Sequence, residues 1–186
     1  MVAAVLTPLC ELVLGGARSG KTGFALERAE ASGLATVMVA TAEPLDEEMR
    51  ARIAAHRTER GPGWTTIEEG RDLTGVIDRE AGAGRVLVVD CLTLWLSNLM
   101  AAEADVDAEI ERLCAGLARA AGPVILVSNE VGLGIVPENA LARRFRDLQG
   151  RLNRRVAAVA GRVVFVAAGL PLVMKDVSES GGSRRE

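Results

Sequence analysis

Short β-branched apolar runs alternate with longer amphipathic stretches along most of the chain. The short runs are nearly continuous, which is typical of strands that are buried on both faces of a sheet. The longer stretches carry helix-forming residues with apolar positions at helical spacing. This alternation predicts βαβ units, in which helices cover both faces of a mostly parallel central sheet. We therefore expect an α/β fold.

The predicted elements follow one another without an internal repeat or an interdomain linker. Strands are expected at residues 12–14, 35–40, 64–67, 85–90, 123–128, 162–167 and, at the edge of the sheet, 170–174. Helices are expected at residues 21–31, 46–60, 71–81, 108–121 and 138–160. Residues 1–176 are expected to form one domain. The polar, Gly/Ser-rich residues 177–186 are predicted to be a disordered tail.

Composition changes this interpretation little but narrows the choice of partners. The 186 residues are 49% hydrophobic and 25% charged, close to an average globular protein. A formal net charge of −3 gives no electrostatic reason to bind nucleic acid or an anionic membrane, because both favour basic surfaces. We therefore expect a small-molecule partner and no nucleic acid.

The cysteines and the apolar segments indicate the compartment. Cys10, Cys91 and Cys114 are far apart and show no C-x-x-C spacing, so neither a disulfide framework nor a zinc site is expected. The apolar N-terminal segment contains Pro8 and Glu11 and lacks a basic region, unlike a signal peptide. No uninterrupted apolar run reaches the roughly 18 residues that a membrane-spanning helix needs. A cytoplasmic protein with no membrane span is the expectation.

The strongest chemical motif is Gly-Gly-Ala-Arg-Ser-Gly-Lys-Thr at residues 15–22. It fits the phosphate-loop pattern G-x-x-x-x-G-K-[ST] and lies between a predicted strand and a predicted helix, as that loop requires. Glycines let successive backbone N–H groups face phosphate oxygens, and the helix N-terminus adds its positive end. Lys21 would contact the β- and γ-phosphates, and the Thr22 hydroxyl would bind Mg²⁺. The alternative is a glycine-rich turn with an exposed lysine.

A P-loop enzyme also needs an acid at the end of a buried strand to hold its metal ion. Asp90 ends the run Val-Leu-Val-Val-Asp and is the candidate. The alternative for Asp90 is a helix N-cap, since aspartate is common at that position.

His56 is the only histidine in the chain. In the helix predicted for residues 46–60, Arg52, His56 and Arg60 are four residues apart and share one face. Cationic neighbours disfavour the imidazolium, so we expect the pKa of His56 to lie below its usual value and the ring to be neutral and nucleophilic. Taken alone, a single histidine on a charged helix face is more often a solvated surface residue than a functional one.

Three further segments follow predicted strands or open a helix, where open α/β sheets bind ligands. They are Ala-Thr-Ala-Glu at 40–43, Asn-Glu-Val-Gly-Leu-Gly-Ile-Val-Pro at 129–137 and Ala-Arg-Arg-Phe-Arg-Asp at 142–147. Together with the phosphate loop and Arg-Ile-Ala-Ala-His-Arg at 52–57, they closely resemble the bifunctional adenosylcobinamide kinase/adenosylcobinamide-phosphate guanylyltransferase family of cobalamin biosynthesis. The resemblance covers residues 12–175, and the 129–137 run is its most specific part.

The resemblance implies a RecA-like P-loop fold, often assembled as a homotrimer, and two activities. The family phosphorylates the aminopropanol hydroxyl of adenosylcobinamide using ATP or GTP, and then moves GMP from GTP onto that phosphate through a guanylyl-histidine. Only His56 can fill that position here. The nucleotide contacts implied by the resemblance are Gly15, Gly16, Ala17, Arg18, Ser19, Gly20, Lys21, Thr22, Ala40, Thr41, Ala42, Arg57, Thr58, Glu59, Arg60, Glu68 and Asp90.

Several roles stay open at this point. If the match between this chain and the family is shifted by one residue, Glu69 takes the place of Glu68. Either Asp90 or Glu130 could be the base of the kinase step. Some family members carry two adjacent histidines where this chain has Ala55 and His56. The sequence contains no Asn-Lys-x-Asp run of the kind that binds guanine in many GTPases.

Other side chains have a structural interpretation beside a functional one. The apolar positions of residues 94–100 are interpreted as core or subunit interface, with corrinoid contact as the alternative. Arg143 and Arg146 are either solvated or contacts for an anionic substrate. Two other functions compete with the family's reactions. One is a P-loop kinase in which His56 is incidental, and the other is a noncatalytic nucleotide-binding module.

Overall fold

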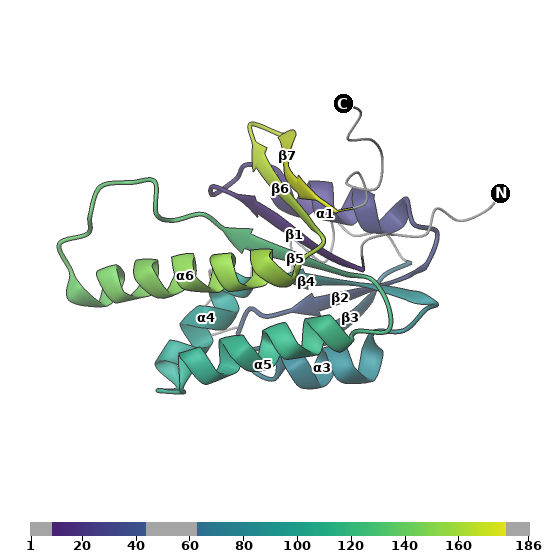
Figure 1. Cartoon of the computed structure of the whole chain (residues 1–186), viewed down its shortest axis with the longest axis horizontal. Coiled ribbons are helices and arrows are strands. Elements are labelled where there is room, and N and C mark those ends of the chain that lie inside the picture. The colour runs from purple at the N-terminus through teal and green to yellow at the C-terminus, as the bar shows by residue number, and fades with distance from the viewer. Residues whose placement is uncertain (1–8, 44–62, 178–186) are drawn as a thin grey trace, which may run out of the picture.

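The strands form a single sheet in the computed structural model, which describes residues 9–43 and 63–177. Its order is β3-β2-β4-β5-β1-β6-β7 (Figure 1). The strands are β1 Cys10–Gly15, β2 Ala35–Ala40, β3 Thr65–Glu68, β4 Arg85–Asp90, β5 Val124–Asn129, β6 Arg162–Ala167 and β7 Leu170–Asp176. Neighbouring strands are parallel except for β7, which runs antiparallel to β6. The predicted mostly parallel sheet is confirmed.

Helices cover both faces of this sheet, as the sequence predicts. They are α1 Lys21–Glu30, α3 Leu73–Glu80, α4 Leu92–Ala101, α5 Val106–Arg119 and α6 Ala140–Val159. Helix α1 lies on one face, and α3, α4, α5 and α6 lie on the other (Figure 1). Successive residues of a strand point to opposite faces, so Leu12 and Leu14 join the larger core while Val13 packs towards α1.

Polar side chains mark where these helices begin. Asp72 accepts a hydrogen bond from the Gly75 amide at the start of α3, and Asp105 accepts one from Ala108 at the start of α5. Asn139 accepts from the amides of two residues in the first turn of α6. Each cap satisfies amides that have no partner within the helix, so these helices begin within about two residues of their predicted starts.

Helix α4 was missed by the sequence analysis, which interpreted the apolar positions of residues 94–100 as core or subunit interface, with corrinoid contact as the alternative. Its residues are apolar almost throughout, so they lack the alternation of faces by which an amphipathic helix is recognised. Leu92, Trp95, Leu96 and Leu99 are buried in the larger core. The core interpretation is confirmed for Leu96 and Leu99, whereas Leu94 and Met100 are only partly buried. The helix itself is a correction.

Some predictions fall on residues that the structure does not describe. These are the helix at 46–60 and the tail from 178 onward. The edge strand expected at 170–174 is confirmed as β7. All three cysteines are buried and free, which confirms the absence of a disulfide. No helix among residues 9–43 and 63–177 has the length and apolar character needed to cross a membrane.

The carboxyl ends of the central strands meet at one edge of the sheet. Ala40 at the end of β2 lies opposite Asp90 at the end of β4, and Asp90 lies opposite Val127 of β5. Gly15 at the end of β1 lies opposite Asn129 at the end of β5. This register brings residues from four separate motifs to the edge where α/β sheets bind ligands.

Glu11 is a buried charge that ties β1 to its neighbours. Its side chain is 3% exposed, with Oε2 at 3.0 Å from Arg28 Nε on α1 and Oε1 at 3.3 Å from Arg162 Nε on β6. Arg162 also pairs with Asp176 on β7. A buried carboxylate is tolerated because two guanidinium groups face it.

We predict that Glu11→Ala lowers the free energy of unfolding by about 2–3 kcal/mol, because it leaves two arginines without their shared partner. Glu27→Ala is the matched control, since Glu27 is exposed on α1, and should change stability by less than about 0.5 kcal/mol. Urea titration of both variants measures the difference. Equal stability of the two variants would contradict the structural role of Glu11.

Candidate active site

The loop between β1 and α1 has the backbone shape of a phosphate loop. Arg18 has φ 55° and Gly20 has φ 94°, so both residues lie in the left-handed region. Gly20 is the N-cap of α1 and provides no side-chain cap. The positive end of α1 therefore faces the loop without a capping side chain, an arrangement suited to an anion.

Glycine is required at position 15 by close packing. A Cβ on Gly15 would lie 2.4 Å from the Val166 carbonyl oxygen and 2.5 Å from Ser19 Oγ. The Gly15 carbonyl accepts a hydrogen bond from the Glu130 amide at 3.0 Å, and the Ser19 carbonyl accepts one from Gly169 at 2.8 Å. The loop is thus fixed between the end of β5 and the turn that joins β6 to β7.

Lys21 lies over this loop. The residue is 8% exposed, and its Nζ donates to the Gly16 carbonyl at 2.8 Å. The alternative of a turn with an exposed lysine is therefore wrong. Ser19 Oγ is buried and has no hydrogen-bond partner among the described residues. A buried ammonium and an unsatisfied hydroxyl on one glycine-rich loop are what a phosphate group would satisfy.

Asp90 ends β4 at the edge of the sheet that carries this loop and is partly buried. The residue at the N-cap of α4 is Cys91, so Asp90 does not occupy the capping position that the alternative required. Its neighbour is held by Thr41, whose hydroxyl donates to the Cys91 carbonyl and accepts from the Cys91 amide, both at 2.8 Å. The Thr41 amide also donates to the Asp90 carbonyl. Thr41 is 0% exposed, and its described contacts brace the Asp90 backbone.

The thiol of Cys91 is beside Asp90 but is poorly suited to be a nucleophile. Burial raises its pKa above the usual value, and the negative charge of Asp90 raises that pKa further. The thiolate, which is the reactive form, is therefore disfavoured.

A buried polar network at the end of β5 was missed by the sequence analysis. Gln149 Nε2 donates to Ser128 Oγ at 2.9 Å and to Asn153 Oδ1 at 3.0 Å, and the Ser128 hydroxyl donates to the same Oδ1. Asn153 Nδ2 donates to the Asn129 carbonyl, and the Asn129 amide donates to Thr93 Oγ1. The sequence signal that could have revealed it is Gln149 and Asn153, two side-chain amides four residues apart on the apolar face of the helix predicted at 138–160. The network fixes the end of β5 against α4 and α6.

The two adjacent glutamates after β3 have different surroundings. Glu69 Oε1 accepts from the amides of Arg71 and Asp72, both at 2.9 Å, so its carboxylate stabilises the turn into α3. Glu68 lies opposite Ala40 in the sheet register. Nucleotide contact by Glu68 stays a prediction. Because the carboxylate of Glu69 is already used in the turn, Glu68 is favoured over Glu69 as the nucleotide contact.

Other predicted site residues lie outside the described part of the chain. They are His56, Arg57, Thr58, Glu59 and Arg60. Residues 9–43 and 63–177 contain no cluster of three or more His, Cys, Asp or Glu side chains that could hold a metal ion without other ligands. Thr22 and Asp90 supply oxygen donors, which Mg²⁺ prefers, and it commonly completes its shell with phosphate and water. Their chemistry fits the predicted ion.

Four features together define a P-loop nucleotide-binding protein. They are a mostly parallel sheet, a glycine-rich loop between a strand and the following helix, a buried lysine, and an acid at the end of another strand. Residues 11–174 match the family model described as cobinamide kinase / cobinamide phosphate guanyltransferase. The chain belongs to this enzyme family.

Curated relatives agree with the family model. The bifunctional adenosylcobalamin biosynthesis protein CobP of Pseudomonas aeruginosa is 48% identical over 167 residues, which are 89% of this chain and 96% of the relative. The bifunctional adenosylcobalamin biosynthesis protein CobU of Escherichia coli is 38% identical over 88% of this chain and 98% of its own length.

Solved structures show the same fold at low sequence identity. An ATPase from the type III secretion system of pathogenic bacteria has a TM-score of 0.53 at 10% identity, covering 89% of this chain and 56% of that chain. A Pyrococcus horikoshii OT3 protein has a TM-score of 0.54 at 10% identity, covering 92% and 88%. At this identity the likeness concerns the fold alone.

We predict that Gly15→Ala lowers stability by about 2 kcal/mol and weakens GTP binding at least about tenfold, because the added methyl has no room and displaces the loop. Gly23→Ala on α1 is the control, because a Cβ there meets no described atom within 4 Å. That variant should be as stable as the wild type or more stable by up to about 1 kcal/mol, since alanine favours a helix. Urea titration and calorimetric GTP binding measure both effects. A Gly15→Ala protein that binds GTP normally would contradict the packing argument.

Proposed function

We propose that this enzyme phosphorylates the aminopropanol hydroxyl of adenosylcobinamide with ATP or GTP and then transfers GMP from GTP to the new phosphate through a guanylyl-His56 intermediate. The product is adenosyl-GDP-cobinamide. The observation that carries the proposal is the phosphate loop with buried Lys21 Nζ on the Gly16 carbonyl, in a chain that belongs to the cobinamide kinase / guanyltransferase family.

The loop would hold the nucleotide phosphates in both steps. Backbone amides of residues 15–22 would face the phosphate oxygens, and Lys21 would neutralise the charge that develops on the leaving phosphates. The Ser19 hydroxyl is an additional donor, since Oγ is buried without a described partner. Thr22, and Asp90 directly or through water, would hold Mg²⁺, which would supply positive charge that stabilises the phosphates.

In the kinase step, the substrate hydroxyl oxygen forms a bond to the γ-phosphorus while the bond from that phosphorus to the bridging oxygen breaks. The nucleoside diphosphate leaves, and the hydroxyl proton passes to a base. Positioning and charge neutralisation account for most of the catalysis, so no covalent residue is needed. Asp90 and Glu130 are the two candidates for the base, because Asp90 ends β4 and Glu130 follows β5 at the edge of the sheet that carries the loop.

In the transfer step, a neutral imidazole nitrogen of His56 attacks the α-phosphorus of GTP, and pyrophosphate leaves. The phosphate of adenosylcobinamide phosphate then attacks the same phosphorus, the nitrogen–phosphorus bond breaks, and the histidine is regenerated. Covalent catalysis of this kind divides one transfer into two easier displacements. Arg52 and Arg60, on the same predicted helix face, would attract the phosphates and keep the imidazole neutral.

Oligomer formation is also part of the proposal, and the family resemblance suggests a trimer. The edge strand β7 leaves Leu170, Leu172 and Met174 exposed to 73%, 64% and 62%. Apolar side chains gathered at an exposed sheet edge are typical of contact surfaces. A contact between copies of this chain would cover them.

We predict that Lys21→Ala lowers both the kinase and the guanylyltransferase rates at least about 100-fold, because both steps need the phosphates held and neutralised. The other lysine, Lys175, is on β7 and donates to the carbonyls at the end of α6. Lys175→Ala should leave both rates within about twofold. Loss of only one activity in Lys21→Ala would argue against a shared loop.

We predict that His56→Ala abolishes guanylyl transfer and leaves appreciable kinase activity, because only GMP transfer needs a covalent nucleophile. Label from α-phosphate-labelled GTP should attach to the wild type and be absent from the variant. The bond should be acid-labile and stable to alkali, as expected for nitrogen bound to phosphorus.

The same labelling separates the competing functions. A simple kinase would form nucleoside diphosphate without any labelled protein, and a noncatalytic module would bind GTP without turnover. If His56→Ala still accumulates covalent GMP, the assignment of the nucleophile is wrong.

A further inference from the structure

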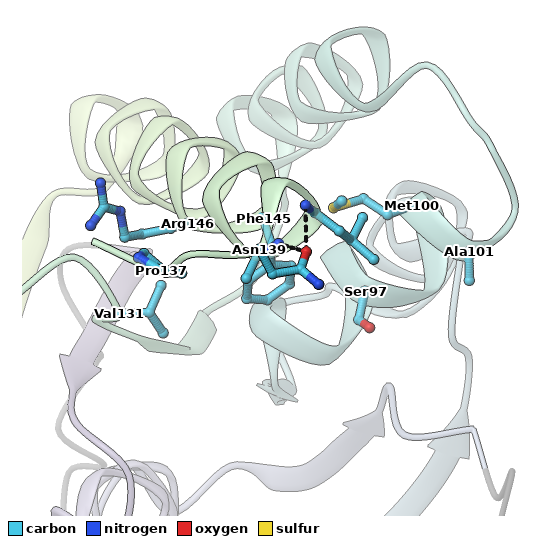
Figure 2. A pocket seen from close by; sticks show the side chains of 10 residues that line it. Ser97, Met100, Ala101, Val131, Pro137, Asn139, Phe145 and Arg146 are labelled. Carbon is cyan, nitrogen blue, oxygen red and sulfur yellow. Dashed lines mark hydrogen bonds between the residues drawn. The ribbon is translucent and has the colours of Figure 1, made fainter. Parts of the chain in front are cut away.

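A large pocket opens between α4 and α6 outside the phosphate loop. Its volume is about 750 Å³, within the size range of small-molecule sites. Ser97 and Met100 line it from α4, Val131 from the segment after β5, and Ala142 and Phe145 from the first turns of α6 (Figure 2). We call this cavity the α4–α6 pocket.

The pocket borders the nucleotide site through two short connections. Val131 follows Glu130, whose amide donates to the Gly15 carbonyl at 3.0 Å. Helix α4 begins two residues after Asp90, and the Thr93 hydroxyl on its first turn accepts a hydrogen bond from the Asn129 amide. A ligand in the pocket would therefore lie next to the carboxyl ends of β4 and β5, where the nucleotide phosphates are proposed to bind.

Most residues that line the pocket are apolar, and its surroundings extend that apolar surface. Met100 and Phe145 are only partly buried by the rest of the chain. The segment between Val131 and Pro137, two residues that line the pocket, exposes Leu133 to 83% and Ile135 to 96%. Exposed apolar side chains gathered beside a cavity mark a binding site for a large ligand with apolar faces.

A single cation occupies one end of the pocket. Figure 2 shows Arg146 at the end beside Val131 and Pro137, with Met100 and Ala101 at the opposite end. The Arg146 side chain is 22% exposed, and among the described residues its one ion pair is a long contact of 3.9 Å with Asp147. Its guanidinium therefore keeps donors for an anion at the end nearest the phosphate loop.

We propose that the α4–α6 pocket binds the corrin ring of the acceptor substrate, with Arg146 contacting the phosphate of adenosylcobinamide phosphate. The inference rests on the proposed function, since phosphate transfer requires the acceptor to be bound beside the nucleotide. The ring presents apolar edges and amide groups, which suit a pocket lined mostly by apolar side chains with Ser97, Asn139 and Arg146 as its polar members. The phosphate exists only after the kinase step, so Arg146 acts on the second substrate and not on the first.

Filling the pocket tests the first part. Equilibrium dialysis with adenosylcobinamide should give a Kd at least about tenfold higher for Ala142→Trp than for the wild type, because the indole occupies the ring's space. Ala158→Trp is the matched control, since Ala158 is exposed on the same helix and away from the pocket. GTP binding should stay within about twofold in both variants, which also shows that they are folded.

The outcomes of this dialysis are distinct. Wild-type affinity for adenosylcobinamide in Ala142→Trp would overturn the pocket assignment, as would weakened GTP binding with normal adenosylcobinamide binding. If the wild-type protein binds GTP but no adenosylcobinamide, the proposed function itself fails and the pocket assignment falls with it.

Arg146→Gln tests the second part and does not alter the apolar walls. The KM for adenosylcobinamide phosphate in GMP transfer should rise about tenfold, while the KM for adenosylcobinamide in the kinase step stays within about twofold. Arg154→Gln, on the exposed side of the same helix, should change neither constant. An equal rise for both substrates, or no rise for the phosphate, would show that Arg146 does not bind the acceptor phosphate.

Discussion

The close packing of Gly15 against Val166 and Ser19 is the constraint on which the rest of the site depends. No side chain fits at this position, because a Cβ would lie 2.4 Å from the Val166 carbonyl oxygen. This close approach lets the Gly15 carbonyl accept a hydrogen bond from the Glu130 amide, and that bond positions the segment after β5. It also orients the loop that Lys21 covers. One steric requirement thereby links the phosphate loop to the segment that leads into the proposed acceptor pocket.

Hydrogen bonds then hold the remaining strand ends around that loop. Thr41 fixes the backbone at Asp90, and the amides of Gln149 and Asn153 hold the end of β5. These groups are buried, so their hydrogen bonds are costly to leave unmade and rigidly define the geometry. Such rigidity suits an enzyme whose catalysis depends on positioning phosphates and neutralising their charge. The nucleotide and the acceptor would meet at the strand ends that these hydrogen bonds hold in place.

Local patterns were enough to predict most of this arrangement, and long-range contacts were not. The phosphate loop, the acid at Asp90 and the parallel sheet each follow from a short stretch of sequence. Helix α4 was missed because its mostly apolar residues show little helical periodicity. The contacts of Glu69 and Gln149 depend on partners brought together only by the fold. His56 and its arginine neighbours lie outside the described residues, and their role stays a prediction.

In the proposed mechanism, GMP reaches its acceptor in two displacements through His56. The stereochemical course at the α-phosphorus tests it most directly, because each in-line displacement inverts the configuration. GTP carrying sulfur in one configuration at the α-phosphorus would be converted to product, and the configuration of the product would be assigned by phosphorus NMR. Two displacements through His56 would give net retention. Net inversion would show a single direct transfer and would contradict the covalent intermediate.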